Sequence, residues 1–70
     1  MKAYAERIKY LRIETGLSQD DLAKELGVSN AIISLWENGL REPSMSSLVA
    51  MANFFHVSVD YIVGLTDEYK

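Results

Sequence analysis

Apolar side chains recur along this chain at intervals of three and four residues, and we interpret no segment as a strand. That spacing is the period of an α-helix with one apolar face, and it first predicts a helix over residues 3–15. Tyr4, Ile8 and Leu11 share the apolar face of this helix. Gly16 follows, and we expect it to end the helix in the left-handed conformation.

Each of the four later helices is predicted to begin after a serine, because a serine hydroxyl accepts hydrogen bonds from the free amides at a helix start. The first of them, Ser18, is expected to bond the amide of Asp21, whose carboxylate can bond back as a short capping box. The four helices begin after Ser18, Ser29, Ser44 and Ser58.

Other residues mark the ends and the inner faces of these helices. Gly27 closes the second helix, Gly39 follows the third, and Pro43 prevents a helix from continuing directly upstream of it. His56 follows the apolar face of the fourth helix, where we expect it to cap the C-terminus. The positions expected to pack inward are Leu22, Ala23, Leu26, Ile33, Trp36, Leu48, Met51, Ala52, Phe55, Val59, Ile62 and Val63.

The predicted architecture is all-α, with one compact five-helix domain over residues 1–70 and a frayed tail at residues 66–70. A chain of 70 residues leaves no room for a second domain. No apolar run approaches the roughly 20 residues of a membrane span, and the first ten residues lack the apolar core of a signal peptide. The chain contains no cysteine, which fits a cytoplasmic location.

The side chains available for chemistry are few. The chain has one histidine and no cysteine, so a histidine-based triad and a multi-histidine metal site are both excluded. Its adjacent carboxylates belong to a helix start and to the tail, and no group of glycines forms a phosphate-cradling loop. We therefore expect no enzyme activity, no cofactor, no metal and no small-molecule substrate.

Residues 17–43, LSQDDLAKELGVSNAIISLWENGLREP, place two short amphipathic helices on either side of a tight turn at Gly27. This is the sequence form of a helix-turn-helix, centred on residues 18–38. The second helix of such a motif enters the major groove of DNA. The pattern therefore predicts a DNA-binding domain.

The segments LSQDDLAKELGVS, IISLWENG, REPS and VSVDYIVG together resemble the Cro/C1-type (XRE-like) helix-turn-helix family of phage repressors and bacterial regulators. The resemblance runs from about Ile8 to Leu65. It implies a lambda-repressor-like domain that binds double-stranded DNA sequence-specifically, as a transcriptional repressor. It also implies a homodimer on a palindromic operator, with the third helix as the recognition helix.

The resemblance further assigns roles by position. Gln19 would contact the DNA backbone and brace the recognition helix. Arg12 and Glu37 would form a buried ion pair that ties the first helix to the third, since a guanidinium and a carboxylate pair through two parallel bonds. The residues in base-contacting positions are Ser29, Asn30, Ala31, Ser34 and Leu35. The further backbone contacts are Asn38, Arg41 and Ser46, and the dimer contacts are Val59 and Tyr61.

The residue chemistry supports part of this assignment and leaves alternatives open. Asn30 can hydrogen-bond adenine N6 and N7 together, and Ala31 can contact a thymine methyl. Gln19 and Asn30 could instead be ordinary solvated residues at a helix start. For Trp36, packing against the fourth helix is favoured over stacking on a base. Tyr61 could be a core residue rather than a dimer contact, and so could Val59.

The net charge of the chain supports a DNA-binding function less strongly than the helix-turn-helix motif does. The net charge is −3, whereas nucleic-acid binders are usually basic. Residues 1–15 carry four cationic side chains against two carboxylates, but residues 42–70 carry one against four. Ile32, Leu35 and Leu40 place aliphatic side chains on or near the predicted DNA face. A protein-interaction module on the same fold, antirepressor-like or antitoxin-like, therefore remains a second interpretation.

Overall fold

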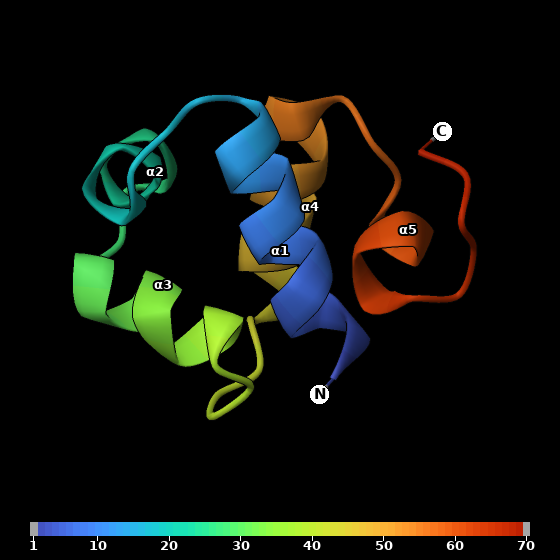
Figure 1. Ribbon diagram of the computed structural model, residues 1–70, viewed down its shortest axis with the longest axis horizontal. Coiled ribbons are helices and arrows are strands. Elements are labelled where there is room, and N and C mark those ends of the chain that lie inside the picture. The colour runs from blue at the N-terminus through green and yellow to red at the C-terminus, as the bar shows by residue number, and fades with distance from the viewer. Residues whose placement is uncertain (1, 70) are drawn as a thin grey trace.

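The computed structural model describes residues 2–69, and these residues form five helices and no strand. The predicted all-α fold is therefore confirmed. In Figure 1, α2 and α3 lie to one side of α1, while α5 and the tail lie to the other. The helices are α1 (Ala3–Glu14), α2 (Gln19–Leu26), α3 (Asn30–Glu37), α4 (Met45–Phe55) and α5 (Val59–Val63).

Serine caps begin four of these helices, as the sequence predicts. The Ser18 hydroxyl accepts a hydrogen bond from the Asp21 amide at 3.0 Å, and the Asp21 carboxylate accepts one from the Ser18 amide at 3.2 Å. The bond from the Ser18 amide is the main cause that holds the pKa of the Asp21 carboxyl below its ordinary value, because it favours the charged form. The other capping serines are Ser29, Ser44 and Ser58, which accept from the amides of Ile32, Ser47 and Tyr61.

Left-handed residues follow four of the helices at the expected places, which are Gly16, Gly27, Gly39 and His56. Gly27 has φ +70° and donates its amide to the carbonyls of the last turn of α2, which produces the tight turn between α2 and α3. His56 has φ 58° and is the C-terminal cap of α4, so the capping role predicted for it is confirmed. The turns after these helices are therefore determined by local residue types.

The core lies where the five helices meet, and each helix contributes one fully buried large side chain to it. Burying a side chain of this size contributes roughly 1.5–3 kcal/mol. No helix is therefore dispensable to the hydrophobic cluster. The five side chains are Ile8, Leu22, Ile33, Met51 and Ile62.

Residues 66–69 contact α1 and α5 in the structure, whereas the sequence predicts a frayed tail at residues 66–70. The Tyr69 carbonyl accepts a hydrogen bond from the Ser58 amide at 2.7 Å, and the Tyr69 ring meets the Tyr61 ring edge-on at 4.8 Å. Thr66 and Asp67 both accept hydrogen bonds from Arg7. Half of these contacts use main-chain atoms, which are the same in every residue and therefore cannot be predicted from residue types. Lys70 lies outside the described residues.

The C-terminal end of α5 lies very close to the N-terminal end of α1. Gly64 ends α5 with φ +88°, and a Cβ atom placed on it would lie 2.5 Å from the Cβ atom of Ala3. Val63, which was expected to pack inward, is instead 36% exposed beside this junction. Glycine at position 64 is therefore required both by its backbone angle and by its neighbour.

Gly64→Ala is expected to destabilise the domain by more than Gly16→Ala, as measured by urea unfolding. Both glycines have positive φ, where a Cβ atom costs about 1–2 kcal/mol, but a Cβ atom on Gly16 would meet nothing within 4 Å. Adding Ala3→Gly to Gly64→Ala should recover the stability that is lost in excess of the Gly16→Ala loss. Equal losses in the two single variants would contradict the close approach of α5 to α1.

Candidate nucleic-acid interface

The helix α3 exposes one side along its length. Asn30 and Ala31 are exposed, and Ser34 and Leu35, one turn further on, are half-buried. The helical period places these four residues on one side of α3, and Ser29, the exposed cap, precedes them. The five positions assigned to base contact therefore begin at the helix start and follow its outward side.

Three large apolar side chains near this side differ in exposure. Trp36 is only 3% exposed, so it belongs to the core and is not placed to stack on a base. Ile32 is half-buried and packs against the core, so its expected place on the DNA face is not supported. Leu40, in the loop after α3, is 75% exposed. Leu40 and part of Leu35 thus provide the apolar surface near the outward side.

One buried carboxylate receives hydrogen bonds from two other helices. Arg12, on α1, donates from Nε to Glu37 Oε2 at 2.6 Å and from Nη2 to Oε1 at 3.0 Å. Gln19, on α2, donates from Nε2 to Glu37 Oε1 at 3.2 Å. The predicted ion pair is therefore present. We call Arg12, Gln19 and Glu37 the Glu37 network.

The Glu37 network is buried on the carboxylate side and largely buried on the guanidinium side. The exposed fractions of the Glu37 and Arg12 side chains are 3% and 13%. The hydrogen bonds that Arg12 donates to the Glu37 carboxylate raise the pKa of the Arg12 guanidinium above its ordinary value. A buried charge is tolerated only when it is paired and hydrogen-bonded, so the three groups fix one another. The network therefore sets where the C-terminal end of α3 lies against α1 and α2.

The residues assigned to backbone contacts surround the outward side of α3. Asn38 is exposed and donates from Nδ2 to the carbonyl of Ser34 at 2.9 Å, which extends the polar surface of the helix by one turn. Arg41 is exposed and lines a groove of about 260 Å³ between α3 and the start of α4. Ser46, in the first turn of α4, is also exposed. Gln19 is half-buried because it braces Glu37.

The two residues assigned to the dimer contact differ in accessibility. Tyr61 is 5% exposed, with the Arg7 guanidinium 4.2 Å above its ring, so core packing describes its position. Val59, at the start of α5, is half-buried. Of the two, Val59 is the one that a second copy could reach.

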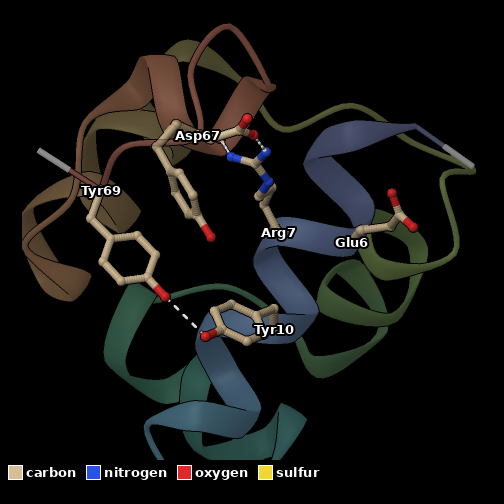
Figure 2. Close-up of a pocket in the computed structure, with 6 residues that line it drawn as sticks. Glu6, Arg7, Tyr10, Asp67 and Tyr69 are labelled. Carbon is tan, nitrogen blue, oxygen red and sulfur yellow. Dashed lines mark hydrogen bonds and ion pairs between the residues drawn. The ribbon is translucent and has the colours of Figure 1, made fainter.

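Nothing in the sequence pattern singles out Arg7, yet its side chain joins α1 to α5 and the tail (Figure 2). Two of its three acceptors are main-chain carbonyls, which have no residue identity to recognise. The only signal in the sequence is its cationic side chain within residues 1–15, which carry four cationic side chains against two carboxylates.

Within residues 2–69, no group of three histidine, cysteine, aspartate or glutamate side chains is arranged to hold a metal ion. No helix of the described part has the length and apolar character needed to cross a membrane.

The family model described as Helix-turn-helix matches residues 8–62. A curated relative, the uncharacterised HTH-type transcriptional regulator YobD of Bacillus subtilis, is 35% identical over 65 residues, which are 93% of this chain and 58% of YobD. An uncharacterised HTH-type transcriptional regulator of Methanocaldococcus jannaschii is 39% identical over 62 residues, which are 89% of this chain and 94% of that protein. The chain thus spans little more than half of one relative and nearly all of the other.

A solved structure adds a comparison in three dimensions. The crystal structure of the c2 repressor of Salmonella phage P22, in complex with synthetic operator 9T, is similar to this chain with a TM-score of 0.83 and 35% sequence identity. The similarity covers 90% of this chain and 96% of that chain. These three proteins are named as transcriptional regulators and a repressor, and none of them as an enzyme.

Glu37→Ala is expected to lower the free energy of unfolding by about 3–5 kcal/mol, because Arg12 would keep its burial and lose its partner. Urea unfolding followed by helical circular dichroism measures this loss. The matched control is Glu25→Ala, which removes an exposed carboxylate from α2 and should stay within about 0.5 kcal/mol of the parent. A loss as small as that of the control would contradict the structural role of the Glu37 network.

Proposed function

Since this chain belongs to the Helix-turn-helix family of DNA-binding transcriptional regulators, we propose that it binds a palindromic operator as a homodimer and represses transcription there. The observation that carries the proposal is the outward side of α3, which is exposed and is held in place by the Glu37 network. The proposal is supported by the likeness to a repressor whose structure contains a synthetic operator. Its place of action is the cytoplasm.

The base-reading residues in this proposal are Ser29, Asn30, Ala31, Ser34 and Leu35. Asn30 is the principal reader, because it is exposed in the first turn of α3 and its amide can bond both N6 and N7 of an adenine. Ala31, which is also exposed, offers only apolar surface and would lie against a thymine methyl. The proposed preference is therefore for A·T pairs at the centre of each half-site.

The backbone contacts in this proposal come from helix starts more than from cations. Gln19 and Ser46 stand in the first turns of α2 and α4, where free amides and the helix dipole favour a phosphate. Asn38 adds a polar contact, and Arg41 supplies the one cationic side chain among the residues assigned to DNA. Because few cations would neutralise phosphates, binding should depend only weakly on salt compared with a basic protein.

Dimerisation completes the proposed mode of binding. A single module of this size contacts too few base pairs to be selective. Two copies on half-sites one helical turn apart contact twice as many. Val59 at the start of α5 is the accessible residue of the predicted contact, and Tyr61 would support it from the core. Two-fold symmetry of the protein would then require an inverted repeat in the DNA.

A protein partner is the second candidate function, and one observation favours it. Leu40, in the loop before α4, and Met45, the first residue of α4, are 75% and 72% exposed and lie close in sequence to the proposed DNA face. An apolar interface formed there would persist as salt is added, whereas phosphate contacts weaken. The DNA complex should therefore weaken with added salt, although less than that of a basic protein, while the protein complex should not weaken.

The proposed function predicts the outcome of a selection experiment. The chain is incubated with a pool of random duplex DNA near physiological salt, and the retained DNA is sequenced. Enrichment of an inverted repeat with half-site centres about 10 bp apart is expected. If protein well above micromolar concentration enriches no sequence, sequence-specific DNA reading is refuted and the protein partner becomes the leading candidate.

Asn30→Ala is expected to weaken binding to the enriched duplex by about 1–3 kcal/mol and to relax the preference at one base position. The control is Glu68→Ala, which truncates an exposed side chain in the tail, on the other side of α1 from α3 (Figure 1). Titrations against the duplex and its single-base variants measure both effects. An equal loss of affinity on every sequence would make Asn30 a backbone contact instead of a base reader.

A further inference from the structure

The helix α5 depends on the rest of the chain for its structure. It has five residues, far fewer than an isolated helix needs to be stable in water. Its start is capped by Ser58, and its one fully buried side chain, Ile62, holds it to the core. The carbonyl groups at its C-terminal end carry the negative end of the helix dipole and need donors.

Main-chain amides supply part of them, since Gly64 donates to the Tyr61 carbonyl at 3.2 Å and Leu65 donates to the Asp60 carbonyl at 2.8 Å. Arg7, on α1, adds a side-chain donor to the Tyr61 carbonyl (Figure 2). Its Nη1 atom donates to the carbonyl of Tyr61, in the last turn of α5, at 2.9 Å and to the carbonyl of Thr66 at 2.9 Å. Its Nη2 atom donates to Asp67 Oδ1 at 2.8 Å. The Asp67 side chain is 99% exposed and that of Arg7 is 22% exposed, so the ion pair is weak and the carbonyl contacts are the stronger ones.

The tail closes around the tip of Arg7. The Tyr69 hydroxyl bonds the Tyr10 hydroxyl on α1 at 2.9 Å, and the Tyr69 carbonyl accepts from the Ser58 amide at the start of α5. Residues 58–69, which we call the α5–tail unit, therefore form a loop whose two ends meet each other. Arg7 is the side chain that bonds both the helix and the tail of this loop. A hollow of about 420 Å³ remains beside it, lined by Glu6, Arg7, Tyr10, Tyr61, Asp67 and Tyr69.

We propose that Arg7 is a positioning residue that sets where the α5–tail unit lies on α1, and thereby aligns Val59 for contact with a second copy of the chain. This inference rests on the proposed dimer. The geometry requires arginine, because its rigid fork of donors engages two carbonyls and a carboxylate at once. A lysine has a single nitrogen and cannot occupy all three places.

The effect of Arg7 should be confined to one side of α1. Its hydrogen bonds within residues 2–69 go to Tyr61, Thr66 and Asp67, all in the α5–tail unit. The outward side of α3 is held from the other side by the Glu37 network. Loss of Arg7 should therefore misplace α5 while leaving the DNA-reading helix as it is.

The test compares Arg7→Met with Lys9→Met in the full chain. Lys9 is an exposed cation on the same helix, so the control removes the same charge. Native-state hydrogen exchange reports on the amides of Ile62, Gly64 and Leu65, and sedimentation equilibrium reports on association. For Arg7→Met, exchange at these amides and the dimer dissociation constant should each rise on the order of tenfold, the size of a lost charge-assisted hydrogen bond.

The inference has expected results in the controls and three results that would overturn it. Arg7→Lys should behave like Arg7→Met. Lys9→Met should keep the exchange rates and the dimer dissociation constant of the parent, and in Arg7→Met the amides of α2 and α3 should exchange at parent rates. An equal rise of exchange in all helices would make Arg7 a general stabiliser and overturn the proposal, and so would an unchanged dimer constant in Arg7→Met. A parent chain that stays monomeric would refute both the proposed dimer and this role of Arg7. The selection from random DNA would still test sequence-specific DNA binding independently.

Discussion

The structure depends most on the buried carboxylate of Glu37, which accepts hydrogen bonds from α1 and α2 while standing at the end of α3. Hydrophobic packing alone lets short helices slide and rotate against one another, because apolar contacts have no fixed direction. A carboxylate that must be satisfied by Arg12 and Gln19 permits one arrangement of the three helices. The outward side of α3 inherits that arrangement, and with it the position of Asn30.

The helix α1 carries a guanidinium for each half of the domain. Arg12 reaches a side-chain carboxylate on α3, and Arg7 reaches main-chain carbonyls of α5 and the tail. The two arginines are five positions apart, so they project from α1 in different directions. Their partners, α5 and α3, lie on the two sides of α1 in Figure 1. In the proposed dimer, one side reads the half-site and the other sets the distance between half-sites. The same short helix would thus coordinate contact with DNA and contact with the second copy.

The helices were predictable because single residue types determine their boundaries. The Ser18 capping box, the Gly27 turn and the His56 cap are each formed by neighbours in the chain, so a local pattern contains them. The Arg12–Glu37 pair spans 25 residues and was predicted only through the family resemblance. No local pattern determines such a pairing.

The failures of prediction share one cause, which is dependence on tertiary packing. The tail is held through the carbonyls of Thr66 and Tyr69, and main-chain atoms are the same in every residue. Ile32 lies against the core and Val63 lies outside it because of how α3 and α5 are rotated, which the helical period alone leaves undecided. The surface properties of the site were therefore less predictable than its helices.

The central claim is that the Glu37 network orients the recognition helix, and the double variant Arg12→Met with Glu37→Leu tests it most directly. Replacing a buried ion pair with apolar side chains of similar size often leaves stability unchanged, so this variant should remain folded. The measurement is the ratio of its affinities for the enriched duplex and for a scrambled duplex of the same composition. The account predicts that this ratio falls while the free energy of unfolding stays near the parent value. A folded double variant that keeps the full ratio would contradict it.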